Sequence, residues 1–206
     1  MKRSNIITTA LFSLALVAGT TAALAQDGRM KADSDMEKNM EGEKTVMVGG
    51  AAMYPSKNIV ENAVNSKDHT TLVAAVKAAD LVETLQSDGP FTVFAPTNAA
   101  FNKLPKGTVE SLVKPENKMK LQGILTYHVL AGKFSSSDIV KAIKDGRGTA
   151  TFKTVNGGNL KAMLKGKNVI LQDENGNTAM VTIADVNQSN GVIHVLDTVV
   201  IPGVAK

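Results

Sequence analysis

The chain of 206 residues contains no cysteine and no tryptophan, and aromatic residues make up only 4% of it. Without cysteine there is no disulfide, no thiol nucleophile, no thiolate metal ligand and no cysteine to carry a lipid anchor. The scarcity of aromatic side chains argues against a surface on which nucleic-acid bases or sugars would stack. These absences exclude several classes of function, and they require the hydrophobic core to stabilise the fold without covalent cross-links.

The N-terminus has the pattern of an export signal. Lys2 and Arg3 precede an apolar stretch that ends in Ala23-Leu24-Ala25, a small-x-small cleavage pattern. The apolar run is short and no basic stop-transfer flank follows it, which favours a cleaved signal peptide over a membrane anchor. We therefore expect residues 1–25 to be a signal peptide and the protein to be exported, either periplasmic or secreted.

Removal of residues 1–25 leaves 181 residues with 21 basic and 19 acidic side chains. That length suffices for one domain with a sizeable core and makes two domains improbable. The small net charge gives no indication of nucleic-acid binding.

Residues 26–56 are rich in charged side chains and show no sustained hydrophobic period, so we expect a flexible leader. The leader also holds spaced methionines: Met30, Met36, Met40, Met47 and Met53. Thioethers can bind Cu(I). No histidine or cysteine of the leader would assist, and the composition favours a disordered arm without a metal.

The remaining chain predicts an α+β layout. Helical spacing over residues 58–65 and 72–86, and a helix start at Ser135, place helices mainly in the first half. Strands are expected at 91–95 and 124–130. From residue 149 the hydrophobic period changes to two, and Asn156-Gly157-Gly158 predicts a hairpin turn. The last strand, residues 192–201, is a β-branched apolar run, which is typical of a strand covered on both faces.

Three segments resemble the fasciclin domain family. The stretch 91–101 (FTVFAPTNAAF) is similar to the first signature of the family, and 190–202 is similar to the second. Between them, Tyr127-His128 lies where the family carries its Tyr-His pair. The resemblance implies a fasciclin domain over residues 57–206: a compact β-sandwich or wedge of two sheets with helices packed along one side. It also implies a role in cell adhesion or contact with extracellular matrix, as a single-domain exported bacterial member.

The resemblance also implies partner-binding residues. In animal members, integrin binding has been assigned to the Tyr-His segment and to an Asp-Ile pair just before the second signature. The matching positions here are Tyr127, His128, Asp185 and Val186. If Tyr127 and His128 lie on the expected strand, they point to opposite faces, and at most one of them meets a given ligand.

Polar residues inside the two signatures are expected to be structural. Thr97 or Asn98 can cap the turn after the first strand. His194 lies in an apolar run, where a histidine is more often a hydrogen-bonded packing residue than a ligand. Asp197 is expected to accept hydrogen bonds from the turn at Thr97 and Asn98.

Catalysis and cofactor binding find no support in the pattern. His69, His128 and His194 lack the spacing of metal ligands, and no nucleophile elbow accompanies them. We expect His69 to be exposed, and we expect no metal, no cofactor and no enzymatic activity. A hydrolase that uses His128 or His194 is the weakest alternative.

We therefore expect a monomeric, non-catalytic protein without stable membrane insertion, which binds a surface or matrix protein or polysaccharide. The alternative is a periplasmic carrier that binds a small apolar ligand or polysaccharide in a groove beside the sandwich.

Overall fold

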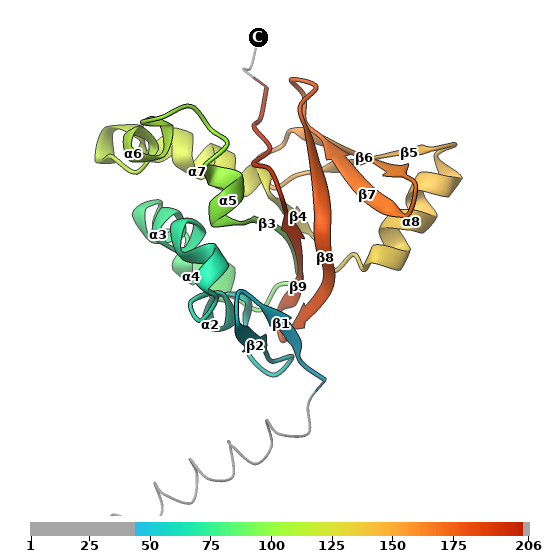
Figure 1. The fold of residues 1–206 in the computed structure, drawn as a ribbon, viewed down its shortest axis with the longest axis horizontal. Helices are drawn as coiled ribbons and strands as arrows, with labels where there is room; N and C mark the ends of the chain where they lie inside the picture. Colours follow the sequence, from blue (N-terminus) through green and yellow to red (C-terminus); the bar gives the residue numbers. More distant parts are fainter. Residues whose placement is uncertain (1–43, 204–206) are drawn as a thin grey trace, which may run out of the picture. The chain divides into compact units, whose positions relative to one another are not determined.

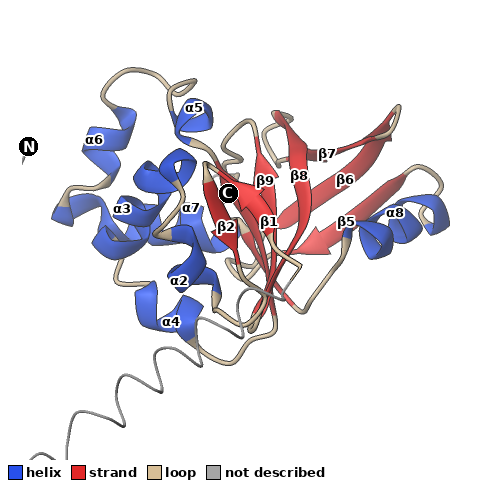
Figure 2. Ribbon diagram, turned by 60° about the horizontal axis from the view of Figure 1, so that its bottom comes forward, coloured by secondary structure: helices blue, strands red, loops and turns tan. Residues whose placement is uncertain are grey.

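The structure is a computed structural model that describes residues 44–203. The expected signal peptide and residues 26–43 of the expected leader lie outside the described residues. Within them, most helices gather on one side of a bent sheet, and α8 covers its other end (Figures 1 and 2). The expected α+β fold is confirmed.

The helical elements run from the first half of the chain into the second. They are α2 (Ile59–Ala63), a 3-10 turn (Lys67–His69), α3 (Thr70–Ala78), α4 (Val82–Gln86), α5 (Asn98–Phe101), α6 (Thr108–Leu112), a second 3-10 turn (Pro115–Asn117), α7 (Lys118–Tyr127) and α8 (Ser136–Asp145). The strands are β1 (Val46–Val48), β2 (Ala51–Met53), β3 (Phe91–Pro96), β4 (Val129–Ala131), β5 (Thr149–Lys153), β6 (Asn159–Lys165), β7 (Asn168–Gln172), β8 (Thr178–Gln188) and β9 (Gly191–Leu196).

Seven strands form one sheet in the order β4-β3-β9-β8-β7-β6-β5, in which only β3 and β9 are parallel neighbours. The long strand β8 pairs with β7 through residues 178–180 and with β9 through residues 181–188. Register shifts between Val181 and Ile183, and between Ile183 and Val186, interrupt the second pairing. Such irregularities bend a strand and increase its twist. The two sheets of the wedge are therefore two arms of one sheet that meet at β8.

The central strands β3 and β9 divide the core in two. Ile193 and Val195 of β9 pack into the cluster beneath the helices of the first half, whereas Leu196 belongs to the cluster under α8. Phe94 of β3 joins the second cluster. All residues of β9 are buried, so the expected burial on both faces is confirmed for residues 191–196, but the strand ends at Leu196 and not at residue 201.

The folded part begins earlier than expected. Strands β1 and β2 pair as an antiparallel hairpin, and Val48 and Met53 are buried in the core. The expectation of a flexible leader is therefore wrong for residues 46–53, because their apolar side chains pack against the cluster beneath the helices. Met53 in particular is a core residue.

Two further elements differ from expectation. The helix expected over 72–86 is broken into α3 and α4, because Asp80 adopts a left-handed conformation with φ of 53°. The strand expected over 124–130 is wrong: α7 continues to Tyr127, and only β4 is extended. Leu121, Ile124 and Leu125 are buried on one face of α7, at the spacing of a helix. The hairpin turn after β5 and the serine cap of α8 are confirmed.

Candidate functional site

Tyr127 is the last residue of α7, and its side chain is completely buried. Its hydroxyl donates a hydrogen bond to the carbonyl oxygen of Asn159 at 2.7 Å. Burial raises the pKa of the Tyr127 phenol to about 12. The ring lies against Gly158, where a Cβ would stand 2.9 Å from Tyr127 Cε2. Tyr127 therefore joins α7 to the hairpin between β5 and β6, and its position requires a glycine in that hairpin.

His128 follows directly and is also buried. Its Nδ1 lies 2.9 Å from the carbonyl oxygen of Ile124, which can only accept, so Nδ1 carries the proton. The Nε2 atom then accepts the backbone N–H of Val200 at 3.2 Å. Burial lowers the pKa of His128 to about 4, against a smaller opposing effect of the Ile124 carbonyl. The neutral ring thus connects the end of α7 to the segment after β9.

Asp185 lies in the irregular part of β8, with φ of 59°. Its carboxylate accepts the backbone N–H of Ser136 at 2.7 Å and also the hydroxyl of Ser136. Because Ser136 is the first residue of α8, the carboxylate stabilises the start of that helix. The adjacent Val186 is a core residue, 1% exposed. The half-buried carboxylate is therefore already bound within the fold, and Val186 offers no surface.

Thr97 and Asn98 hold the turn after β3. The Thr97 hydroxyl accepts the N–H of Ala100 and caps α5, as expected. The Asn98 side chain accepts the N–H of Thr71 and donates to the carbonyl of Lys67, both at about 3 Å, so that it ties α5 to the start of α3.

His194 makes the packing and hydrogen-bonding contacts expected for it. Its Nε2 lies 2.9 Å from the carbonyl oxygen of Phe134, its Nδ1 accepts the N–H of Asp185 at 3.3 Å, and its ring stacks on Phe94. Burial lowers the pKa of His194.

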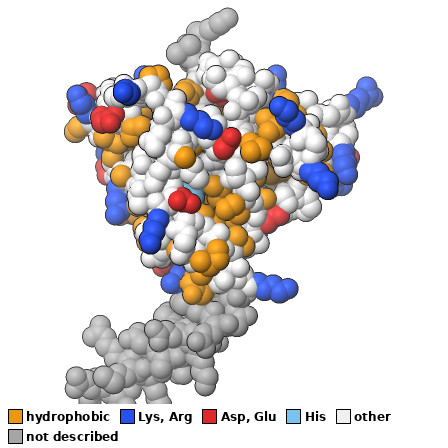
Figure 3. Space-filling model, in the orientation of Figure 1, with side chains coloured by type: hydrophobic (Ala, Val, Ile, Leu, Met, Phe, Trp, Pro, Cys, Tyr) orange, Lys and Arg blue, Asp and Glu red, His pale blue; other side chains and the backbone are white. Residues whose placement is uncertain are grey.

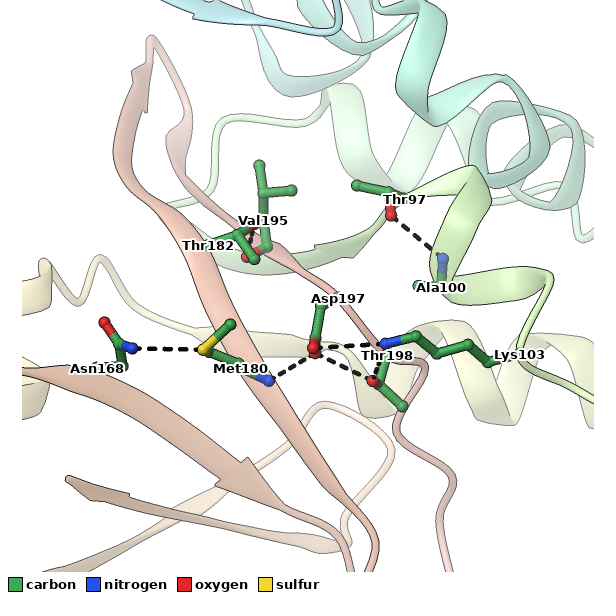
Figure 4. A network of polar contacts seen from close by, with 9 residues as sticks. All are labelled: Thr97, Ala100, Lys103, Asn168, Met180, Thr182, Val195, Asp197 and Thr198. Atoms are coloured by element: carbon green, nitrogen blue, oxygen red, sulfur yellow. Dashed lines mark hydrogen bonds and ion pairs between the residues drawn. The ribbon is translucent and has the colours of Figure 1, made fainter. Parts of the chain in front are cut away.

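Asp197 differs from expectation. Figure 4 shows that its carboxylate accepts the N–H of Met180 at 2.8 Å and contacts the side chains of Thr198 and Lys103. The predicted pairing of Asp197 with the turn at Thr97 and Asn98 is wrong: those side chains are bonded elsewhere, and the neighbour strand β8 supplies the partner.

His69 was expected to be exposed, and this is wrong, because the residue is 3% exposed. Its Nδ1 lies 2.9 Å from the hydroxyl of Ser66. The Ala95 carbonyl lies close enough to oppose the effect of burial, which nevertheless lowers the pKa of His69. Nε2 forms no hydrogen bond of ordinary geometry with any described residue.

These contacts do not assemble a catalytic or metal centre. Among residues 44–203, no group of three or more His, Asp or Glu side chains could hold a metal ion. Ser136, Asp185 and His194 are neighbours, but the serine hydroxyl bonds to the carboxylate and the histidine meets only the backbone of Asp185. A serine nucleophile would need its hydroxyl on the imidazole.

Sequence reasoning missed a partly exposed row of apolar side chains on one face of the sheet. The register aligns Met163 of β6 with Ile170 of β7, and Ile170 with Met180 of β8. These side chains are half-buried, whereas Ala162, Leu171 and Ala179 on the other face are buried beneath α8. We call Met163, Ile170 and Met180 the outer row. The signal was present in the sequence, as an apolar residue at an outward position of each alternating strand.

Basic and polar side chains border the outer row. Lys161 and Lys165 flank Met163 on β6, and Asn168 lies beside Met180 (Figure 4). In the view of Figure 3, hydrophobic atoms lie along the middle of the molecule, and Lys and Arg side chains lie on both sides, over the helices as well as towards β5 and β6.

The carrier alternative expected a groove beside the sandwich without naming its residues, and the described residues form two hollows beside α7. One is an apolar cavity of about 90 Å³ beneath α3 and α4. The other is a groove of about 470 Å³ between α6, α7 and the segment after β9. Leu125 and His128 line both. Neither hollow could be read from the local pattern, because each depends on how separate helices pack. No helix among the described residues is long and apolar enough to cross a membrane.

The fold and its buried polar hydrogen bonds define a class of small α+β wedge domains. In this class two signature segments, here those that contain β3 and β9, form adjacent parallel strands. The chain belongs to the fasciclin domain family, whose model, the fasciclin domain, matches residues 67–202.

Individual relatives agree with this assignment. Protein sll1483 of Synechocystis sp. is 48% identical over 161 residues, which cover 78% of this chain and 82% of that protein. The cell surface glycolipoprotein MPB83 of Mycobacterium bovis is 36% identical over 160 residues, covering 75% of this chain and 64% of that protein.

Among solved structures, a FAS1 domain pair from the insect cell adhesion molecule fasciclin I is similar in fold, with a TM-score of 0.63 and 16% identity. The match covers 76% of this chain and 57% of that one. At this identity the likeness concerns the fold alone.

Proposed function

We propose that the protein is an exported, non-catalytic protein that binds another protein at a cell surface or matrix, and that the outer row is its contact. The observation that carries this proposal is the outer row itself, a partly exposed apolar stripe across three adjacent strands. An apolar centre with a polar rim is the usual anatomy of a protein interface.

The family resemblance implied a different contact, formed by Tyr127, His128, Asp185 and Val186. Three of these side chains are buried, and the fourth is bound to the start of α8. A partner could reach Tyr127, His128 and Val186 only after the wedge had opened, and it would compete with Ser136 for Asp185. The outer row is accessible without such a change, so we favour it.

The chemistry of the rim favours a protein that carries acidic groups. Lys153, Lys161 and Lys165 lie on the outward side of β5 and β6, and no acidic residue lies on that side of β5, β6 or β7. Complementary charge would steer such a partner onto the face. A polysaccharide is the less favoured occupant, because the outer row contains no aromatic ring on which a sugar could stack.

Export is part of the proposal and is supported by the pattern of residues 1–25. The surface location named for the mycobacterial relative points the same way. Mass spectrometry of the protein recovered from the cell envelope or medium should find an N-terminus at Gln26. Recovery of only the intact chain from the cytoplasm would contradict export.

The contact can be tested with two matched substitutions on β7. Ile170→Glu places a charge in the centre of the outer row, whereas Gln172→Glu adds the same charge on the same side of the same strand but at its polar end. Cells that lack the gene would be complemented with each variant, and their attachment to cells and matrix measured.

We expect Ile170→Glu to lower attachment at least 10-fold, as for a residue at the centre of an interface, and Gln172→Glu to leave it within about 2-fold of wild type. Thermal unfolding of both variants establishes that they are folded. Equal attachment by the folded Ile170→Glu and Gln172→Glu variants would contradict the assignment of the outer row. Wild-type attachment by cells that lack the gene altogether would contradict the function.

A further inference from the structure

The groove beside α7 has the size and composition of a ligand site. Its volume of about 470 Å³ falls within the range of about 300–1,000 Å³ that is usual for small-molecule pockets. Its floor is apolar and consists of side chains that are at most 9% exposed: Phe101, Leu112, Leu121 and Ile124. The floor would therefore accept an apolar body of several carbon atoms.

The charged side chains of the groove are all of one sign. Lys106 and Lys120 line it, and no Asp or Glu does. Neither lysine forms an ion pair or a side-chain hydrogen bond with the described part of the chain, and both are exposed. A concave site lined by positive charges alone attracts an anion, and lysine binds carboxylate or phosphate as a point charge. The positive charge of the groove therefore favours a ligand with an anionic head group.

The inner cavity extends the apolar part of the site. The groove and the cavity of about 90 Å³ share Leu125 and His128 as wall residues. His128 is fixed by hydrogen bonds on both ring nitrogens, whereas Leu125 has only packing contacts for its side chain. The cavity offers room for further carbon atoms of the chain if Leu125 turns aside.

We propose that the groove binds a small anionic amphiphile, a linear carboxylate with an apolar chain. Its head lies at Lys106 and Lys120, and its chain runs over Leu121 and Ile124 towards Leu125. This ligand site is separate from the outer row and does not depend on the proposed surface contact.

Isothermal titration calorimetry with the full chain tests the proposal, with hexanoate, octanoate and decanoate below their micelle concentrations as probes. Each added methylene should strengthen binding by up to about 4-fold, as expected for the burial of one CH₂ group. Decanol tests the requirement for charge, and acetate tests the requirement for a chain. Decanoate should bind more tightly than both.

The lysines are tested by Lys106→Gln/Lys120→Gln, which removes both charges and keeps apolar stems of similar length. The matched control is Lys114→Gln/Lys133→Gln, two lysines outside the groove. The first pair should weaken decanoate binding by about 2- to 30-fold, as expected for two exposed ion pairs, and leave decanol binding unchanged. The control pair should have no effect. If both double variants lose decanoate affinity equally, or if neither double variant loses it, the proposal is overturned.

A lipid membrane could supply the same anionic head group, so the last experiment measures binding to vesicles. Vesicles with anionic and with zwitterionic headgroups would be compared with monomeric decanoate. Binding of monomeric decanoate that depends on Lys106 and Lys120 supports the groove. Lysine-dependent binding of anionic vesicles with no binding of decanoate assigns these lysines to a membrane surface and overturns it, as does the absence of any binding at millimolar decanoate.

Discussion

Asp185 gives the sharpest test of whether the residues implied by the family resemblance are structural. Its carboxylate accepts two hydrogen bonds from Ser136 at the start of α8, and its backbone is left-handed. Asp185→Ala removes a cap worth about 1 kcal/mol. It also replaces aspartate with alanine at positive φ, a backbone conformation that aspartate tolerates better than alanine, which adds up to about 1 kcal/mol. The expected destabilisation is thus about 1–2 kcal/mol.

For a domain of this size each kcal/mol corresponds to about 2–4 °C, so the Tm of Asp185→Ala should fall by about 2–8 °C. Asp185→Asn keeps an acceptor and tolerates positive φ, and should lose under about 4 °C. Asp185→Gly removes the acceptor but relieves the backbone, so its Tm should lie between the two. Differential scanning calorimetry distinguishes these cases. If Asp185→Ala melts within 1 °C of wild type, the tie to α8 contributes nothing and the reasoning fails.

Three further predictions concern the other buried polar groups. Because the pKa of His128 is about 4 in the folded protein and about 6.5 when unfolded, protonation favours the unfolded chain: stability is complete above pH 6.5 and falls by about 3 kcal/mol towards pH 4. Denaturant unfolding from pH 7.5 to 4 should show a flatter dependence for His128→Gln, and an identical slope would contradict the pKa assignment. Tyr127→Phe leaves the carbonyl of Asn159 without its partner and should cost about 1–3 kcal/mol in urea unfolding, where no change would show that the bond is unimportant. Asp197→Ala strips the acceptor from the N–H of Met180 and should cost about 1–3 kcal/mol by the same measurement, and an unchanged midpoint would refute its role as a tie to β8.

Patterns that depend on neighbouring residues predicted the fold well. The β-branched run of β9 indicated burial on both faces, and the Gly-rich turn after β5 indicated a hairpin. Ser135 was recognised as a helix start because a serine cap acts within its own first turn. These features are local, so the sequence carries them directly.

The failures concern features that are not local. The run at 124–130 is short and apolar, and such a run fits a strand or a buried helix equally well. The segment is a helix because Leu121, Ile124 and Leu125 are buried together on one helical face. The burial of His69 and the partners of Asp197 likewise depend on segments far apart in the chain.

The candidate sites were the least predictable part. Resemblance pointed to Tyr127 and Asp185, whose side chains are occupied within the fold. The outer row becomes visible only when the register of three strands is known. The groove depends on how α6 and α7 meet the segment after β9, which no local pattern encodes.

Hydrogen–deuterium exchange of the protein in contact with its native surface tests the central claim most directly. We predict added protection in β6, in β7 and in the first residues of β8, with no change at Tyr127, His128 or residues 184–187. Protection confined to residues 127–128 and 184–187, with the outer row unchanged, would contradict the account.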